Sequence, residues 1–337
     1  MKLGNGDTSR EVLVIAEIGN NHEGSFARAQ ELIGRAIEAG AHVVKFQTMV
    51  PEHFVRRSDA ARFARLKSFQ FSYAQFEELS KLAQSNGVPF LSTPFDLESA
   101  RFLNSIVPAF KIASGDSTFY PLLEAVAQFR KPILLSTGLS TLREIAFAKS
   151  LIERVWATTS SDAPDLTLLH CVASYPVPPD QANLGAIRTL ENAFGGTVGY
   201  SDHTLGIEAA VVAVALGARV IEKHFTLDKH QSDFRDHQLS ADPKEFAELV
   251  RRVRETTAML GSGEKIPQAC EAGNLPSLRR SIVANGDLAE GTTLRLEHLT
   301  WTRPGGDVAP GSESLVLGRQ LKRDVGAGDP ITIDILA

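Results

Sequence analysis

The sequence predicts an α/β fold, a (β/α)8 or TIM barrel, followed by a small all-β domain. Between residues 12 and 260, eight short apolar segments alternate with amphipathic or alanine-rich segments, and a closed barrel needs eight such repeats in about 250 residues. Several apolar segments end in polar residues that a buried strand has no packing reason to carry. After about residue 277 the pattern changes to short β-like pieces between Gly/Asp turns.

The predicted strands are apolar runs rich in Val, Ile, Leu and Phe. They cover residues 12–18, 43–48, 89–95, 109–114, 132–137, 166–172, 198–202 and 219–225. A doubly wound open sheet is the alternative, but no GxGxxG motif follows the first strand.

Helix starts can be recognised between these strands. Ser72 with Gln75 and Thr141 with Glu144 have the spacing of capping boxes. The dipeptide at 242–243 combines an aspartate N-cap with proline at the first helical position. These signals place helices between successive strands, as the barrel requires.

Two long connections and the segment after the barrel complete the predicted domain organisation. Residues 49–71 and 227–241 exceed what a barrel needs, and long connections of this kind often carry function or form lids. We expect a barrel domain over 1–262, a polar linker over 263–280 and an all-β domain over 281–337.

Composition limits the class of protein. The chain has 337 residues, 43% of them hydrophobic, and a net charge of −5 without a basic stripe, which argues against a nucleic-acid partner. Residues 1–10 are polar, and no apolar run is long enough to span a bilayer. We expect a cytoplasmic protein with a small-molecule partner and no membrane association. With two cysteines, Cys171 and Cys270, a disulfide scaffold is excluded.

The segment 197–225 holds the most informative strand ends. Residues two apart on a strand share a face, so Ser201 lies with His203, and Glu222 lies with His224 on the next strand. Two imidazoles at one end of a parallel sheet suit a divalent cation. Taken alone, the pair is equally consistent with structural histidines.

The remaining strand ends supply groups that bind anions. Lysines give point positive charge, and hydroxyls donate hydrogen bonds to phosphate or carboxylate oxygens. The polar residues at these ends are Glu17, Asn20, Asn21, His22, Lys45, Gln47, Ser92, Thr93, Lys111, Ser114, Ser136, Thr137 and Tyr175. They indicate a small dianion beside a metal, although the lysines could instead form structural ion pairs with Glu17 or Glu222.

Other histidines have simpler interpretations. His22 precedes a predicted helix and is either a turn residue or functional, and His170 lies in an apolar strand and is expected in the core. His230 and His237 belong to the connection 227–241, where we expect solvent exposure. Asp236 is a candidate because this connection overhangs the strand ends.

The strand-end motifs, taken in order, resemble those of the sialic acid synthase family, the phosphoenolpyruvate-dependent synthases of nonulosonic acids. The resemblance covers nearly the whole chain. It rests on AEIGNNHEG (16–24), KFQ (45–47), FLSTPFD (90–96), KIASGD (111–116), LSTG (135–138), LLHC (168–171), GYSDHT (199–204) and IEKHFTLD (221–228). RRSIVA (279–284) and WTRPGG (301–306) resemble the family's antifreeze-like SAF (β-clip) domain.

The resemblance implies roles for individual residues. His203 and His224 correspond to ligands of a divalent metal, manganese or magnesium. The phosphoenolpyruvate-binding positions are Lys45, Thr93, Lys111, Ser114, Ser136 and Ser201. The positions that face the sugar or serve the chemistry are Glu17, Gln47, Asp116, Tyr175, Glu222 and Asp236, of which we expect Glu17, Asp116, Glu222 and Asp236 to be catalytic. Arg303 resembles an arginine that reaches the sugar's N-acyl group from the partner subunit of a domain-swapped homodimer.

Two departures concern substrate contacts. Ala173 stands where relatives can have Asn, so one polar contact to phosphoenolpyruvate is expected to be missing. The loop motif usually written GPDH is FRDH at 234–237, which keeps the aspartate but introduces Phe234 and Arg235.

The implied reaction joins phosphoenolpyruvate to an N-acylated hexosamine, giving a sialic acid and phosphate. We expect N-acetylmannosamine ahead of the diacetamido sugars of legionaminic and pseudaminic acid, with a 6-phosphate third, because exposed arginines are more often solvated than ligands. The loop residues available to discriminate are His53, Phe54, Arg56, Arg57, Phe234, Arg235 and His237. The alternatives are a legionaminic, pseudaminic or spore-coat polysaccharide synthase of the same family, a Schiff-base aldolase or lyase using Lys45 or Lys111, and a non-catalytic sugar-binding protein.

Overall fold

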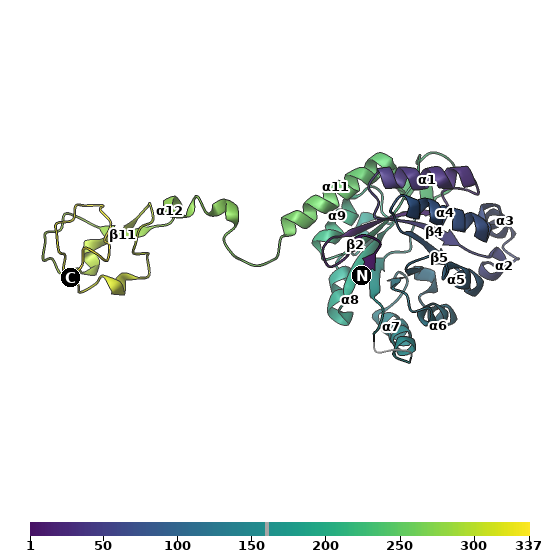
Figure 1. The fold of residues 1–337 in the computed structure, drawn as a ribbon, viewed down its shortest axis with the longest axis horizontal. Coiled ribbons are helices and arrows are strands. Elements are labelled where there is room, and N and C mark those ends of the chain that lie inside the picture. The colour runs from purple at the N-terminus through teal and green to yellow at the C-terminus, as the bar shows by residue number, and fades with distance from the viewer. Residues whose placement is uncertain (159–161) are drawn as a thin grey trace. The chain divides into compact units, whose positions relative to one another are not determined.

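The structure, a computed structural model, describes residues 1–158 and 162–337. The chain forms two compact units, Met1–Gly261 and Ser262–Ala337 (Figure 1). Each unit has its own hydrophobic core.

The first unit is built around parallel strands that form one nearly closed sheet with helices around it (Figure 1). Its strands are β3 (Leu13–Gly19), β4 (Val43–Thr48), β5 (Phe90–Pro94), β6 (Phe110–Ile112), β7 (Ile133–Ser136), β8 (Leu166–Cys171), β9 (Thr197–Asp202) and β10 (Val220–His224). Hydrogen bonds join them in the order β5-β4-β3-β10-β9-β8-β7-β6, and β5 lies next to β6. The prediction of an eight-stranded barrel is confirmed for the part of the chain that the structure describes.

Helices connect consecutive strands, a further helix follows the last strand, and together they cover the outside of the sheet (Figure 1). The main ones are α1 (Phe26–Glu38), α4 (Tyr73–Ser85), α5 (Leu97–Leu103), α6 (Tyr120–Gln128), α7 (Leu142–Ala157), α8 (Ala186–Phe194), α9 (Glu208–Ala215) and α11 (Pro243–Leu260). Both predicted capping boxes form, at Ser72 and Thr141, and the Asp242 side chain caps α11. The capping signals in the sequence therefore set three of the helix starts.

The two long connections contain short helices. The connection after β4 holds α2 (Pro51–Phe54) and α3 (Ala60–Phe69), and the connection after β10 holds α10 (Asp236–Leu239). No residue of α3 is buried, whereas α10 buries three of its four residues. Both connections lie at the carboxyl end of the barrel strands, where they can shape a site.

An antiparallel hairpin precedes the barrel and was not predicted. It consists of β1 (Lys2–Leu3) and β2 (Gly6–Asp7). A side chain at Gly4 would meet Pro89, and one at Gly6 would meet Leu13. Both contacted residues stand where strands begin, so the hairpin packs on the end of the barrel opposite to the long connections.

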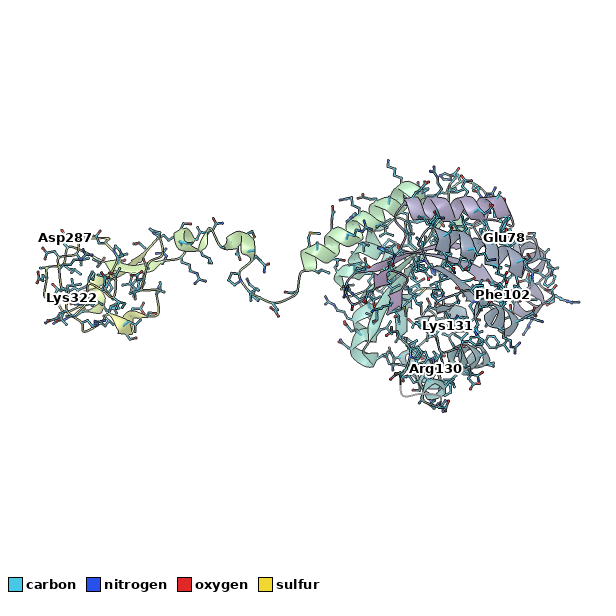
Figure 2. The ribbon with its side chains drawn as sticks, viewed as in Figure 1. Glu78, Phe102, Arg130, Lys131, Asp287 and Lys322 are labelled. Carbon is cyan, nitrogen blue, oxygen red and sulfur yellow. The ribbon has the colours of Figure 1, made fainter. Side chains whose placement is uncertain are left out.

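The second unit contains little regular structure. β11 (Ser281–Ala284) pairs antiparallel with β12 (Leu299–Thr302), α12 (Leu275–Leu278) precedes them, and isolated bridges join the later segments. Charged surface side chains tie its loops together: Asp287 accepts a hydrogen bond from the Ala327 amide and Lys322 donates one to the Asp334 carbonyl (Figure 2). The small all-β character predicted for the tail is confirmed.

Two further properties bear on the class of protein. Among the described residues, no helix is long and apolar enough to cross a membrane. Cys171 is buried, Cys270 is exposed, and both are free thiols.

Candidate active site

A cavity of about 670 Å³ opens at the carboxyl end of the barrel strands. Every barrel residue to which the resemblance assigns a metal, phosphoenolpyruvate, sugar or catalytic role lines it. These are Glu17, Lys45, Gln47, Thr93, Lys111, Ser114, Asp116, Ser136, Tyr175, Ser201, His203, Glu222, His224 and Asp236. Arg303 belongs to the second unit.

Parallel pairing explains why residues so far apart in the sequence meet here. In the register of the sheet, Glu17 stands beside Lys45 on one side and beside His224 on the other. Glu222 stands beside Ser201 in the same way. Because parallel strands end at the same rim, one polar residue per strand is enough to build a charged layer across the barrel.

The floor of the cavity is a network of buried charges. Lys45 Nζ lies 2.6 Å from Glu17 Oε2 and 3.7 Å from Glu222 Oε2, and it donates a hydrogen bond to Thr93 Oγ1 at 3.0 Å. Lys111 Nζ lies 3.4 Å from Glu222 Oε1. The ion pairs that the sequence left open as an alternative are thus present, and both lysines also line the cavity.

These neighbours shift the pKa of each group. Burial lowers the pKa of Lys45, but the charges of Glu17 and Glu222 outweigh burial and raise it above its ordinary value. Burial lowers the pKa of Lys111, which Glu222 only partly opposes. Burial raises the pKa of Glu17, whereas for Glu222 the two lysines outweigh burial and hold the pKa at about 2.

Asp116 differs from the other cavity carboxylates. It is half-buried at the start of the connection after β6, and burial raises its pKa to about 6, although Lys111 acts in the opposite direction. A carboxyl group with a pKa in this range can hold or release a proton near neutral pH.

Two imidazoles lie together on one wall of the cavity. The ring centroids of His203 and His224 are 5.4 Å apart, and the Tyr175 ring stacks on His203 at 4.1 Å. His203 Nδ1 lies 2.9 Å from the Val172 carbonyl oxygen. A proton on Nδ1 satisfies that carbonyl and leaves the Nε2 lone pair free to bind a cation.

His224 gives the stronger indication of a ligand site. Its Nδ1 is buried without a hydrogen-bond partner and lies 4.0 Å from Asp236 Oδ2. Asp236 Oδ1 is likewise buried without a hydrogen-bond partner, and its ion-pair contact is with Arg235 Nε at 3.4 Å. Burial lowers the pKa of His224 well below its ordinary value, which keeps the imidazole neutral as a metal ligand requires. The donor set therefore fits a divalent cation. No group of three or more His, Cys, Asp or Glu has metal-ligand spacing within residues 1–158 and 162–337, so water or substrate would complete the coordination.

The rim of the cavity is largely apolar. It consists of Met49, Phe54, Leu66, Phe69, Phe95, Leu139 and Phe234. Three arginines, Arg62, Arg65 and Arg235, stand among them, and the Arg235 guanidinium lies 4.6 Å from the Tyr175 ring centroid. Sequence reasoning named Phe54, Phe234 and Arg235 but missed the others. For Arg62, Arg65, Leu66 and Phe69 the length of the connection 49–71 was the only signal.

The histidines outside the paired imidazoles have structural surroundings. His170 lies in the core as predicted, with Nε2 2.9 Å from the Ala182 carbonyl oxygen, and His230 is exposed. His22 is a turn residue: its Nδ1 accepts a hydrogen bond from the Gly24 amide. The prediction that His237 is exposed was wrong, because the connection folds back on the barrel and buries the ring completely.

Some strand-end residues have internal partners and do not line the cavity. The Ser92 and Thr48 hydroxyls lie 2.7 Å apart, and Thr137 donates to the Leu169 carbonyl. Of the loop residues proposed to discriminate between sugars, Phe54, Phe234 and Arg235 line the cavity, while His53, Arg56, Arg57 and His237 do not.

Comparisons with known proteins agree with this architecture. Residues 32–265 match the model of the NeuB family and residues 279–337 match that of the SAF domain. An N,N'-diacetyllegionaminic acid synthase of Legionella pneumophila is 38% identical over 95% of this chain and 93% of its own. Mouse N-acetylneuraminate-9-phosphate synthase is 36% identical over 85% of this chain and 82% of its own.

A solved structure is also similar. The N-acetylneuraminic acid synthetase of Leptospira borgpetersenii superposes with a TM-score of 0.75 at 37% identity, covering 81% of this chain and 94% of that one. The resemblance seen in the strand-end motifs is confirmed: the chain belongs to the NeuB family and carries a C-terminal SAF domain.

Proposed function

We propose that the protein condenses phosphoenolpyruvate with the aldehyde form of an N-acylated hexose, giving a nonulosonic acid and inorganic phosphate. The observation that carries the proposal is that two buried lysines and two neighbouring imidazoles line one cavity. Membership of the NeuB family supports the same reaction class.

The anion-binding groups suit phosphoenolpyruvate. Lys45 and Lys111 supply positive charge, and the hydroxyls of Thr93, Ser114, Ser136 and Ser201 surround them. Ser136 Oγ is buried without a hydrogen-bond partner, so it is available to a ligand oxygen. Holding both substrates in one cavity converts a two-body encounter into an oriented pair.

The residues also match the changes in bonding. The C3 carbon of phosphoenolpyruvate attacks the aldehyde carbon, and a C–C bond forms as the C=O π bond breaks. The aldehyde oxygen takes up a proton and becomes a hydroxyl group, and positive charge develops at C2. A carboxylate such as Glu17 or Asp116 stabilises that charge or receives a proton from the water that adds to C2. The C2–oxygen bond then breaks, and phosphate leaves with the bridging oxygen.

A divalent cation, manganese or magnesium, completes the proposed site. His203 and His224 would hold it, with Asp236 beside them. When bound, such a cation polarises a carbonyl oxygen as a Lewis acid. Tyr175 and the Val172 carbonyl then serve to orient the His203 ring.

The acceptor is proposed from the rim of the cavity. A deoxy sugar with two acyl groups favours aromatic and apolar contacts, and the rim supplies Phe54, Phe69, Phe95 and Phe234. On this basis a 2,4-diacetamido-trideoxyhexose ranks ahead of N-acetylmannosamine, the reverse of the order expected from the sequence. The name of the Legionella relative is consistent with this order.

Phosphate release from phosphoenolpyruvate, measured in parallel with each acceptor, tests this assignment. We expect the highest kcat/KM with a 2,4-diacetamido sugar, a lower value with N-acetylmannosamine and the lowest with its 6-phosphate. A preference for N-acetylmannosamine or its 6-phosphate would contradict the acceptor assignment and leave the reaction class intact.

The rival reaction class has one observation in its favour, the lowered pKa of Lys111. A Schiff-base lyase would form an imine between a lysine and pyruvate. Borohydride treatment with pyruvate distinguishes the two classes. The proposed synthase gives no covalent adduct on Lys45 or Lys111, and a stable adduct would support the lyase.

A further inference from the structure

Two loops at the carboxyl end of the barrel are joined by polar side chains. One loop follows β3 and carries Glu23, and the other follows β10 and carries Gln231 and His237. Glu23 Oε1 accepts a hydrogen bond from Gln231 Nε2 at 2.9 Å and lies 3.1 Å from His237 Nε2. The second ring nitrogen, His237 Nδ1, lies 2.7 Å from Thr226 Oγ1. We refer to the pair formed by Glu23 Oε1 and His237 Nε2 as the Glu23–His237 contact.

The contact is buried on the histidine side. The His237 side chain is 0% exposed and that of Glu23 is 21% exposed. A buried polar group that loses its partner costs free energy, because no water replaces the lost hydrogen bond. Through Nε2 the His237 ring therefore fixes the loop after β10 to the loop after β3, and through Nδ1 it holds the loop to its own start at Thr226.

The backbone at Glu23 gives a second, independent observation. Glu23 has a φ of +47°, in the left-handed region that residues other than glycine seldom adopt. The next residue, Gly24, has a φ of +80°, and a side chain there would come within 2.2 Å of the Ser68 carbonyl oxygen. A strained backbone persists only where surrounding contacts hold it.

The segment that the contact secures carries cavity residues. Phe234, Arg235 and Asp236 directly precede His237, and all three line the cavity. The carboxylate of Asp236 has only long contacts, 3.4 Å to the Arg235 side chain and 4.0 Å to His224 Nδ1. Its position therefore follows from the backbone of the loop.

The two residues before Asp236, Phe234 and Arg235, contact aromatic rings of other segments. Phe234 meets Phe69 edge-on at 5.4 Å, and Arg235 lies over Tyr175. These residues follow β10, whereas Lys111 and Ser136 stand on β6 and β7, which β9 and β8 separate from β10 in the sheet. The loop and these two anion-binding groups therefore enter the cavity from different parts of the barrel.

We propose that Glu23 and His237 are positioning residues that hold Asp236, Arg235 and Phe234 at the acceptor end of the cavity. This proposal rests on the proposed function, because the acceptor is taken to be the N-acylated hexose of that reaction. It assigns the loop after β10 to the hexose, whereas phosphoenolpyruvate depends mainly on the lysines and hydroxyls of other strands. Loss of the contact should therefore affect the two substrates unequally.

The kinetic test compares Glu23→Ala with Glu23→Gln. The alanine variant is expected to raise KM for the acceptor sugar at least ~10-fold, since displacement of a positioned group by about 1 Å can cost far more. KM for phosphoenolpyruvate should stay within about twofold. The glutamine variant keeps an oxygen that accepts from both Gln231 and His237, so it should recover most of the acceptor affinity. Glu31→Ala, an exposed glutamate on α1, is the control and should match the unchanged protein.

A second measurement does not depend on turnover. Hydrogen exchange of the amides of residues 227–241 in the substrate-free protein should be at least ~10-fold faster in Glu23→Ala than in Glu23→Gln. Unchanged protection of these amides would overturn the proposal. Faster exchange with equal changes in both KM values would also overturn it, because the contact would then be structural only. If the unchanged protein released no phosphate with any N-acylated hexose, the proposed function would fail, and the exchange result would still decide the contact.

Discussion

The paired imidazoles are the residues on which the proposed site depends most. His203 is oriented through Nδ1 by the Val172 carbonyl, while His224 Nδ1 is buried with no partner. Each belongs to a different strand end, and together they supply two imidazole nitrogens to one wall of the cavity. The arrangement can hold a divalent cation with open positions for water or substrate.

Removing either imidazole should therefore remove the cation. We expect His203→Ala and His224→Ala each to weaken Mn²⁺ binding by ~100-fold or more, a loss beyond that typical of residues that only orient a ligand. Calorimetric titration of the metal-free protein with Mn²⁺ measures this directly. The exposed His230→Ala is the control. Affinity that survives in the His203 and His224 variants would place the metal elsewhere.

The raised pKa of Asp116 predicts that the stability of the folded protein depends on pH. Burial raises its pKa in the folded protein to about 6, from an ordinary value of 3.8. The folded state thus holds this proton more tightly than the unfolded state, and the resulting stability is fully present below pH 3.8 and is lost as pH rises through about 6. Asp116→Asn carries no titrating carboxyl group and does not lose this stability.

The two proteins should therefore differ in Tm only at higher pH. At pH 8 the Asp116→Asn variant is expected to melt a few degrees above the unchanged protein, because about 1 kcal/mol shifts Tm by ~2–4 °C in a domain of this size. The difference should shrink between pH 7 and 5 and vanish near pH 4. A Tm difference that is independent of pH would show that burial of Asp116 does not disfavour its charge.

At the scale of elements, β9 is constrained by its only glycine. A side chain at Gly199 would come within 2.6 Å of the Val220 carbonyl oxygen and 2.5 Å of a Leu169 side-chain carbon. The strands on both sides therefore approach more closely at Gly199 than a larger residue allows. This close approach brings the ends of β9 and β10, with both imidazoles, into register.

Gly199→Ala should disturb that register. We expect overpacking to lower the free energy of unfolding by about 1–3 kcal/mol, measured by urea denaturation. Gly185→Ala is the matched control, since Gly185 has φ −56° and no atom lies within 4 Å of the place that an alanine methyl group would occupy. That change should be neutral or stabilising by up to ~1 kcal/mol. Equal effects at the two glycines would contradict the account.

Most elements of the barrel can be predicted because strand and helix periodicity are local signals. The strands lie within one or two residues of their predicted ends, and both capping boxes form. The hairpin at 2–7 was missed because two-residue strands have no detectable period. The later β-like pieces of the second unit pair only through isolated bridges, which depend on tertiary contacts.

The candidate site likewise contains residues that local sequence signals predict and residues that they do not. Lys45, Lys111, His203 and His224 are predictable because they stand at strand ends, where the topology of a barrel gathers polar residues. Arg62 and Phe69 lie on α3, which has no buried face to give it a pattern. The burial of His237 depends on a partner 214 residues away, and no local signal reports such a contact.

At the scale of the whole molecule, the chain has two units with separate cores. The barrel unit, Met1–Gly261, contains the complete cavity, and the SAF unit contains Arg303. We propose a homodimer in which Arg303 of each SAF domain serves the barrel of the other chain. This arrangement would give the SAF domain a role in sugar binding and none in the barrel's stability.

Deletion of residues 277–337 tests this arrangement. The truncated chain should remain folded, with an unchanged circular dichroism spectrum, because the barrel core is self-contained. Its KM for the acceptor should rise at least ~10-fold, as expected when a charged contact worth about 1.5–3 kcal/mol is lost. Arg303→Ala in the full chain is the matched variant and should raise KM similarly. A truncated monomer with full activity would contradict the proposed homodimer.

In the proposed reaction, attack by C3 of phosphoenolpyruvate and addition of water at C2 precede the loss of phosphate. Phosphoenolpyruvate labelled with ¹⁸O in the oxygen that bridges C2 and phosphorus tests this order most directly, by mass spectrometry of both products. The account predicts that the label appears in the inorganic phosphate, that its release requires the N-acylated hexose, and that the new acid contains a solvent oxygen at C2. Label retained in the organic acid, or phosphate released equally well without the hexose, would contradict it.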